Sequence, residues 1–271
     1  MSLLAAAFLM SAFPVFAQTA GPNPLVPAPP VPAEVDLNLI NLPTTLSLQR
    51  HRGYFRLTHR FARDLRRGTF NDLASSLFSL DDGAVIGLEY RFAVTGTVHA
   101  GATRSMLSKT IQTFVRWDAL RQSETRPVSV SAMASYEGLN NLRDDHQPGV
   151  ALTVSRTMGD RIAVYATPAF VQNTRAVDTI SGHPDHDSTW LAGLGTRVRF
   201  SRGGYLVAEF TPRLAGYDPN RGVWGVGLEK RTGGHTLQLN ITNSFGTTLG
   251  QLARGGSAHD VYLGFNITRK F

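Results

Sequence analysis

The chain contains 271 residues, of which 42% are hydrophobic and 17% are charged. This balance excludes an intrinsically disordered acidic chain and a heavily charged helical domain. Cysteine is absent, which excludes disulfide frameworks, thiolate zinc sites and thiol nucleophiles. Of the 27 cationic residues 24 are arginines, and they are spread along the chain rather than gathered in one basic run. We therefore expect no nucleic-acid partner.

Residues 3–16 form an apolar stretch that only Ser11 and Pro14 interrupt. The residues up to Ala17 fit a signal-peptidase site, and the stretch is too short for a comfortable membrane helix. We expect residues 1–17 to be a cleaved signal peptide, with a buried helix of the domain as the alternative. No Lys or Arg precedes the stretch, which leaves the true translation start open.

The residues that follow are rich in proline and alanine. We predict residues 18–42 as a Pro-rich periplasmic linker, extended and without a core of its own, and residues 43–271 as one domain. After residue 35 no window approaches 18 consecutive apolar residues, which excludes a transmembrane helix in the domain.

Strict alternation of apolar and polar residues recurs through the domain in segments of about ten residues, the length of a tilted strand that crosses a bilayer. The last segment shows it best, because Leu263, Phe265 and Ile267 alternate with Gly264 and Asn266. About twelve strands are predicted, at 53–62, 84–92, 97–105, 110–120, 127–136, 150–157, 161–172, 190–200, 205–214, 222–230, 236–242 and 261–270.

Loop lengths alternate as well. The connections after even-numbered strands are short and several contain glycine, whereas most connections after odd-numbered strands are longer, as at 63–83, 137–149, 173–188 and 246–258. Bacterial outer-membrane barrels have short periplasmic turns and long outer loops. The predicted fold class is all-β, a single antiparallel up-and-down transmembrane β-barrel in the cell outer membrane. The alternative is a secreted β-sandwich or soluble barrel, although its strands would usually be shorter.

The final predicted strand carries Phe271 after a row of alternating apolar residues. This pattern resembles the signal that the barrel-assembly machinery of Gram-negative bacteria reads. We expect Phe271 to be part of an assembly signal, with that machinery and outer-membrane lipid as partners. Arg269 interrupts the outward row, but an Arg so near the membrane edge can extend into the headgroup region.

Several motifs resemble, in their order, a family of exported bacterial β-barrel proteins known only as a domain of unknown function. The resemblance spans roughly residues 42–251 and implies an outer-membrane barrel, but it carries no reaction, ligand or site residue. The motifs are Thr58-His59-Arg60-Phe61, Leu77-Phe78-Ser79-Leu80-Asp81-Asp82, Gly101-Ala102-Thr103-Arg104-Ser105, Pro127-Val128-Ser129-Val130, and Thr232-Gly233-Gly234-His235-Thr236-Leu237-Gln238-Leu239 followed by Thr242-Asn243-Ser244.

No common nucleotide-binding, hydrolase or zinc-protease motif is present in the sequence. His183 and His186, with two nearby aspartates, are possible metal ligands, but a solvated outer loop is the preferred interpretation. His59 falls in an apolar register, which indicates the headgroup boundary or a bulge. We therefore expect no catalytic residue, no cofactor and no metal.

We predict a narrow, anion-preferring pore or an envelope scaffold for an unidentified solute, and not an enzyme. One alternative is a barrel enzyme that acts on lipid, for which Asn243, Ser244 and His259 are the only neighbours that suggest a triad. The other is a plugged structural barrel that docks partners.

The lumen charges follow from the alternation, because neighbours of lipid-facing residues point inward. Arg197 and Arg199 are the predicted anion-attracting patch. We expect many of the inward charges to pair and brace the wall, since unpaired charges in a narrow interior are unfavourable. The candidates are Arg56, Arg60, Arg91, Arg116, Arg161, Arg197, Arg199, Arg213, Glu89, Asp118, Glu209 and Glu229.

Overall fold

The computed structural model of the protein describes residues 32–76, 83–174, 188–216 and 221–271. The predicted signal peptide and the His183/His186 loop lie outside the described residues. The strands are β1 (Gly53–Phe61), β2 (Ala84–Ala93), β3 (Val98–Ser105), β4 (Thr110–Leu120), β5 (Ser129–Gly138), β6 (Asp144–Met158), β7 (Ile162–Gln172), β8 (Ser188–Arg199), β9 (Gly204–Thr211), β10 (Arg213–Gly216), β11 (Val223–Thr232), β12 (His235–Thr242) and β13 (Tyr262–Lys270).

The helical segments are short: α1 (Phe70–Ser75), η1 (Leu107–Lys109), α2 (Leu139–Leu142) and α3 (Leu249–Ala253). Within the described ranges, no helix has both the length and the apolar character that a membrane span requires.

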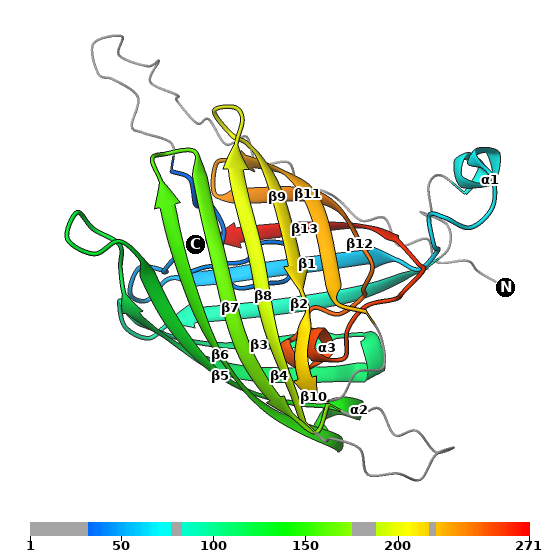
Figure 1. The fold of residues 1–271 in the computed structure, drawn as a ribbon, viewed down its shortest axis with the longest axis horizontal. Coiled ribbons are helices and arrows are strands. Elements are labelled where there is room, and N and C mark those ends of the chain that lie inside the picture. Colours follow the sequence, from blue (N-terminus) through cyan, green and yellow to red (C-terminus); the bar gives the residue numbers. More distant parts are fainter. Residues whose placement is uncertain (1–31, 77–82, 175–187, 217–220) are drawn as a thin grey trace, which may run out of the picture. The chain divides into compact units, whose positions relative to one another are not determined.

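Twelve strands close into one antiparallel ring, because β1 pairs with β13 and β8 pairs with β9 (Figure 1). β10 continues the line of β9 after Pro212 and also pairs with β8. The interruption follows from chemistry, since proline has no N–H group to donate to the ladder. The predicted up-and-down barrel of about twelve strands is therefore confirmed, with β9 and β10 together forming the predicted 205–214 strand.

The wall has polar residues inside and apolar residues outside, the reverse of a soluble protein. Along β13, Asn266 and Thr268 are buried in the interior while Ile267 is 37% exposed. The same holds around the ring, where the exposed large side chains include Phe55, Leu88, Val115, Trp117, Leu152, Trp190, Leu206, Leu228 and Leu239. An apolar outer surface of this extent suits contact with lipid.

The two ends of the barrel differ in their connections. At the short-turn end the strands are joined by tight turns, two of which contain Gly159 and Gly233 with φ of 59°. A positive φ is what such turns require. At the loop end, the predicted long connection 137–149 is wrong, because β5 extends to Gly138 and β6 begins at Asp144. The predicted outer loop 246–258 contains α3, which lies within the ring of strands (Figure 1).

Candidate functional site in the barrel interior

Nine of the twelve predicted lumen charges lie in the interior. These nine residues are each no more than 6% exposed, although each is ordinarily charged. The buried set comprises Arg56, Arg60, Arg91, Arg116, Arg197, Glu89, Asp118, Glu209 and Glu229.

Arginine–carboxylate pairs brace the inner face, as the alternation predicts. Glu89 contacts Arg91 two residues along β2 and lies 3.6 Å from Arg56 on the adjacent β1. Arg116 and Asp118 form the same arrangement on β4, with an N–O distance of 2.8 Å. Buried charges require such partners, because an unpaired charge in a low-dielectric interior is strongly destabilising.

The structure corrects the placement of the other predicted lumen charges. Arg161 is exposed in the turn before β7, because the alternation ends where the strand ends. Arg199, at the end of β8, is 13% exposed at the short-turn end and contacts Asp160 of the β6–β7 turn. Arg213 lies partly buried at the loop end, where its Nη1 donates to the carbonyl of Arg254 at 3.1 Å.

The prediction of an anion-attracting patch at Arg197 and Arg199 is also corrected. Arg197 is fully buried, and its Nε and Nη2 atoms lie 2.7 and 3.0 Å from the carboxylate of Glu229 on β11. A cation paired in this way contributes little net field to the lumen. Arg197 and Arg199 therefore do not form an open cationic patch.

The segment predicted as the end of the linker folds inside the barrel. Residues 36–45, here named the hairpin plug, form a tight hairpin in which Leu39 N donates to Leu42 O at 2.8 Å and Thr44 N donates to Leu37 O at 2.9 Å. The chain enters at the short-turn end, where Pro32 O accepts a hydrogen bond from the Tyr205 hydroxyl, and leaves there to begin β1. The linker prediction is therefore wrong for this part of 18–42.

The tip of the hairpin plug binds Glu209. Three consecutive backbone N–H groups donate to its carboxylate, and so does the side-chain amide of Asn41 at 2.9 Å. The backbone distances are 3.1 Å from Ile40, 2.9 Å from Asn41 and 3.0 Å from Leu42. The carboxylate thus satisfies four buried donors at once, which makes it the main polar anchor of the tip.

Other wall side chains bind the carbonyl groups of the same hairpin. Arg197 Nη2 donates to Asn38 O at 2.7 Å, and Gln238 Nε2 donates to Leu39 O at 3.1 Å. Ile40 O accepts from Asn266 Nδ2 at 3.1 Å and from Arg56. The wall therefore holds the hairpin plug through its backbone, at both donors and acceptors.

A second segment fills the barrel from the loop end. Residues 244–253, here named the loop plug, contain α3, whose five residues are all buried. Gly250 N donates to the Glu137 carboxylate at 3.0 Å, and Gln251 Nε2 donates to Thr110 Oγ1 at 3.1 Å. Leu252 belongs to the same buried apolar cluster as the hairpin tip, so the two plugs meet inside the barrel.

The space left between the plugs is small. A cavity of about 30 Å³ lies between Asn38 and Asn41 of the hairpin plug, Leu249 of the loop plug and the side chains of Glu89 and Arg91. A space of that size is on the scale of a few water molecules at most. The described residues of both plugs pack closely around it, since Asn38, Asn41 and Leu249 are each no more than 5% exposed.

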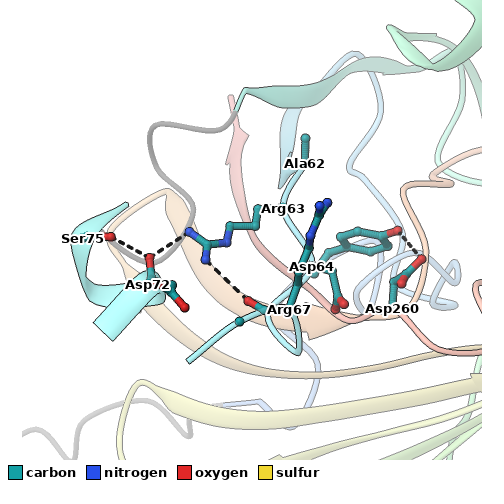
Figure 2. A pocket seen from close by; sticks show the side chains of 9 residues that line it. Ala62, Arg63, Asp64, Arg67, Asp72, Ser75 and Asp260 are labelled. Atoms are coloured by element: carbon teal, nitrogen blue, oxygen red, sulfur yellow. Dashed lines mark hydrogen bonds between the residues drawn. The ribbon is translucent and has the colours of Figure 1, made fainter. Parts of the chain in front are cut away.

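A wider hollow of about 810 Å³ opens at the loop end, beside α1 (Figure 2). Arg63 donates to the Asp72 carbonyl at 2.9 Å, and the Tyr262 hydroxyl donates to Asp260 at 3.1 Å. Hydrogen bonds from the backbone and side chain of Thr69 keep the pKa of Asp72 below its ordinary value. Leu65 N donates to Val261 O at 2.7 Å and Val261 N donates to Asp64 Oδ1 at 2.8 Å, and these two bonds hold the loop beside the start of β13.

Two further side chains singled out in the sequence, His59 and Asn243, pack against or bind neighbouring groups of the wall. The His59 ring stacks on Phe265 with centroids 4.7 Å apart, and strand pairing continues through it without a bulge. Asn243 is occupied by backbone groups, since its Oδ1 accepts from Trp224 N at 2.8 Å and its Nδ2 donates to Ser257 O at 3.0 Å. Its amide is therefore engaged in holding the β12 end of the loop.

The match to a family model decides the classification. Residues 36–271 match the model of the membrane bound beta barrel domain (DUF5777). The chain belongs to this family. The match begins at Asp36, the first residue of the hairpin plug, so the family's domain includes the plug. The resemblance read from the sequence motifs is confirmed.

Solved structures agree on the fold. The KdgM porin is similar with a TM-score of 0.51 at 9% identity, over 81% of this chain and 99% of that one. The NanC porin is similar with a TM-score of 0.52 at 9% identity, over 81% and 98%. No curated protein matches the sequence. The protein is thus a membrane-bound, porin-like β-barrel that contacts lipid.

Neither plug, nor the role of Glu137 in binding the loop plug, is predicted by the alternation of the sequence. A signal for the hairpin plug exists, because the alternation of Val35, Leu37 and Leu39 with polar residues continues upstream of β1. A linker of that apolar content would leave its side chains in water, so burial is favoured. No comparable signal marks the loop plug, whose polar and small residues are typical of an exposed loop.

Proposed function

We propose that this protein is an outer-membrane channel that two of its own segments hold closed. The observation that carries the proposal is that each plug is joined to the barrel wall at one end of the barrel only. The hairpin plug enters and leaves at the short-turn end, and the loop plug enters and leaves at the loop end. Each can withdraw without separating any pair of strands in the ring. The fold is shared with the KdgM and NanC porins, which supports a channel.

The outer-membrane location rests on three features. The chain has a predicted signal peptide, its turns and loops differ in length between the two ends, and its outer surface is apolar. On this assignment the short-turn end faces the periplasm.

A permanently plugged scaffold is the second candidate. It is favoured by the apolar cluster that Leu39, Ile40 and Leu42 form with Leu252, because burying such side chains stabilises the closed state. The two candidates differ in whether displacing the plugs yields a conducting barrel.

Conductance in planar bilayers separates them. Leu39→Glu with Leu42→Glu, named the hairpin variant, places two carboxylates in the apolar cluster beside Glu209, which expels the hairpin plug. Gly250→Val, the loop variant, sets a side chain against Glu137 and Gln147 and displaces α3. We expect the wild type to be closed and the combination of both variants to conduct steadily.

Each single variant is expected to conduct only in brief openings, because the other plug still blocks its own level of the barrel. Gln49→Glu with His51→Glu is the matched control, since it adds the same charges in the exposed connection before β1. A folded combined variant that stays closed would establish the scaffold instead.

The proposed channel, once both plugs have withdrawn, has a preference between anions and cations that the interior charges set. The buried arginines of the described wall, Arg56, Arg60, Arg91, Arg116 and Arg197, face the carboxylates Glu89, Asp118, Glu137, Glu209 and Glu229, so they balance. Lys270, whose ammonium group donates to Val35 O at 2.7 Å, adds one cation when the hairpin plug leaves. We therefore propose a weak preference for anions, measured as the reversal potential of the combined variant in a salt gradient.

We assign no catalytic role to the barrel. The Asn243 amide is engaged with backbone groups, so it is not available to orient a histidine. Hydrolysis of phospholipid by the refolded protein would replace this part of the proposal with the lipid-enzyme alternative.

The proposal includes a role for the last strand and Phe271 in assembly of the barrel into the outer membrane. Phe271 N and O pair with Gly53 O and N at 3.0 and 2.8 Å, which extends the β1–β13 seam by one residue pair. We expect deletion of Phe271 to lower the amount of heat-modifiable barrel in the outer membrane several-fold, because this residue contributes to the seam and belongs to the proposed assembly signal. Leu214→Ala, which removes another exposed apolar side chain, is the control. Undiminished assembly of the deletion would remove this role.

A further inference from the structure

We propose that the wall around the hairpin tip is a binding site for oligopeptides with aliphatic side chains, which the hairpin plug occupies in cis. The inference rests on the proposed function, since an outside peptide reaches the site only after the plug withdraws. Its contacts define the ligand class independently of conductance.

The wall recognises amide groups. Glu209 accepts from backbone N–H groups, while Gln238, Asn266 and the arginines donate to backbone carbonyls. Even the Asn41 side chain is bound as an amide, since its oxygen accepts from Arg60 at 3.1 Å and its nitrogen donates to Glu209 at 2.9 Å. Binding through amide groups is the feature that all peptides share.

The site is held in shape by contacts that do not involve the plug. Gln238 Nε2 donates to Glu229 at 2.8 Å, and Gln238 Oε1 accepts from Asn240 at 2.9 Å and Asn266 at 2.7 Å. Arg60 donates to Asn266 Oδ1 at 2.8 Å. Because these side chains are fixed by one another, this part of the site keeps its shape when the hairpin leaves, and a new peptide loses less entropy on binding.

Glycines in the wall accommodate the aliphatic side chains of the hairpin. A Cβ atom at Gly195 would overlap Leu39, and one at Gly193 would overlap Leu42. At Gly225 it would lie 2.9 Å from the Ile40 side chain. The three positions form slots for branched aliphatic groups.

The surroundings favour a peptide over two other ligand classes. At the hairpin tip an anion would lie against the Glu209 carboxylate, whose charge repels it locally, and a saccharide would leave the aliphatic slots unfilled. A peptide that is neutral and aliphatic where it meets Glu209 satisfies both the polar groups and the slots.

The test is binding of a labelled decapeptide with the sequence of residues 36–45 and blocked ends, followed by fluorescence anisotropy in detergent. Wild type is expected not to bind it, because the plug fills the site, whereas the hairpin variant should bind it saturably. The same decapeptide N-methylated at the positions of Ile40, Asn41 and Leu42 lacks the donors for Glu209. We expect it to bind at least about ten-fold more weakly.

A variant of the wall provides the second control. Gly193→Leu in the hairpin variant fills the Leu42 slot and should abolish binding, whereas Ala192→Leu adds the same side chain on the outer face of β8 and should not. Folding of each is checked by heat-modifiable migration. Equal binding of the methylated peptide, no binding by the folded hairpin variant, or displacement by maltohexaose would each overturn the inference. Saturable binding in a barrel that never conducts would instead overturn the channel and leave the site standing.

Discussion

Replacing Glu209 with Gln is expected to release the hairpin plug from the barrel interior. The carboxylate accepts from Ile40 N, Asn41 N, Leu42 N and Asn41 Nδ2, and all four of these hydrogen bonds are buried. Glutamine keeps one acceptor oxygen but turns an NH₂ group toward the remaining donors. A loss of about 3 kcal/mol in plug binding follows, which raises the withdrawn fraction about a hundred-fold.

The absence of cysteine allows a direct measurement of this release. The hydroxyl oxygens of Thr45 in the plug and Ser155 on β6 lie 2.5 Å apart, so Thr45→Cys with Ser155→Cys places two thiols within bonding reach. The rate of disulfide formation then reports the inserted plug. We expect Glu209→Gln to lower that rate strongly.

Asp160→Asn is the matched control, because it makes the same chemical change in an exposed turn that does not touch the plug. Unchanged cross-linking in Glu209→Gln would show that the apolar cluster alone holds the hairpin in place.

Breaking the Arg197–Glu229 pair is expected to be the most destabilising single change in the wall. Both side chains are fully buried, and Arg197→Met leaves the Glu229 carboxylate with Gln238 as its remaining described partner. Loss of one partner of a buried pair costs about 3–5 kcal/mol. Urea unfolding of the refolded barrel, followed by tryptophan fluorescence, measures it.

Adding Glu229→Gln to Arg197→Met should restore most of the lost stability, because the isolated charge is then gone. Arg199→Met is the control on the same strand. Its partner Asp160 is 55% exposed, so we expect a cost of no more than about 1 kcal/mol. Equal effects of Arg197→Met and Arg199→Met would show that burial does not govern the energy of these pairs.

The buried ion pairs differ in whether the sequence predicts them. Glu89 with Arg91, and Arg116 with Asp118, are two residues apart on one strand, so the period of two places each pair on one face. Arg197 and Glu229 lie on β8 and β11, which the ring separates by β9. Their contact depends on side chains that reach across the curved interior, and no local pattern encodes that.

The wall of the barrel is predictable from the amino-acid pattern alone, because alternation, strand length and turn residues are local properties that fix which residues face lipid and which face inward. What fills the barrel depends instead on contacts between residues that are far apart in the chain. The hairpin plug reaches Glu209 across about 170 positions of sequence, at separations of 167 to 169 residues. Closing the barrel removed Leu39, Ile40 and Leu42 from water and left the backbone N–H groups of Ile40, Asn41 and Leu42 in need of an acceptor. The interior carboxylate supplied it, and that match exists only once the ring is closed.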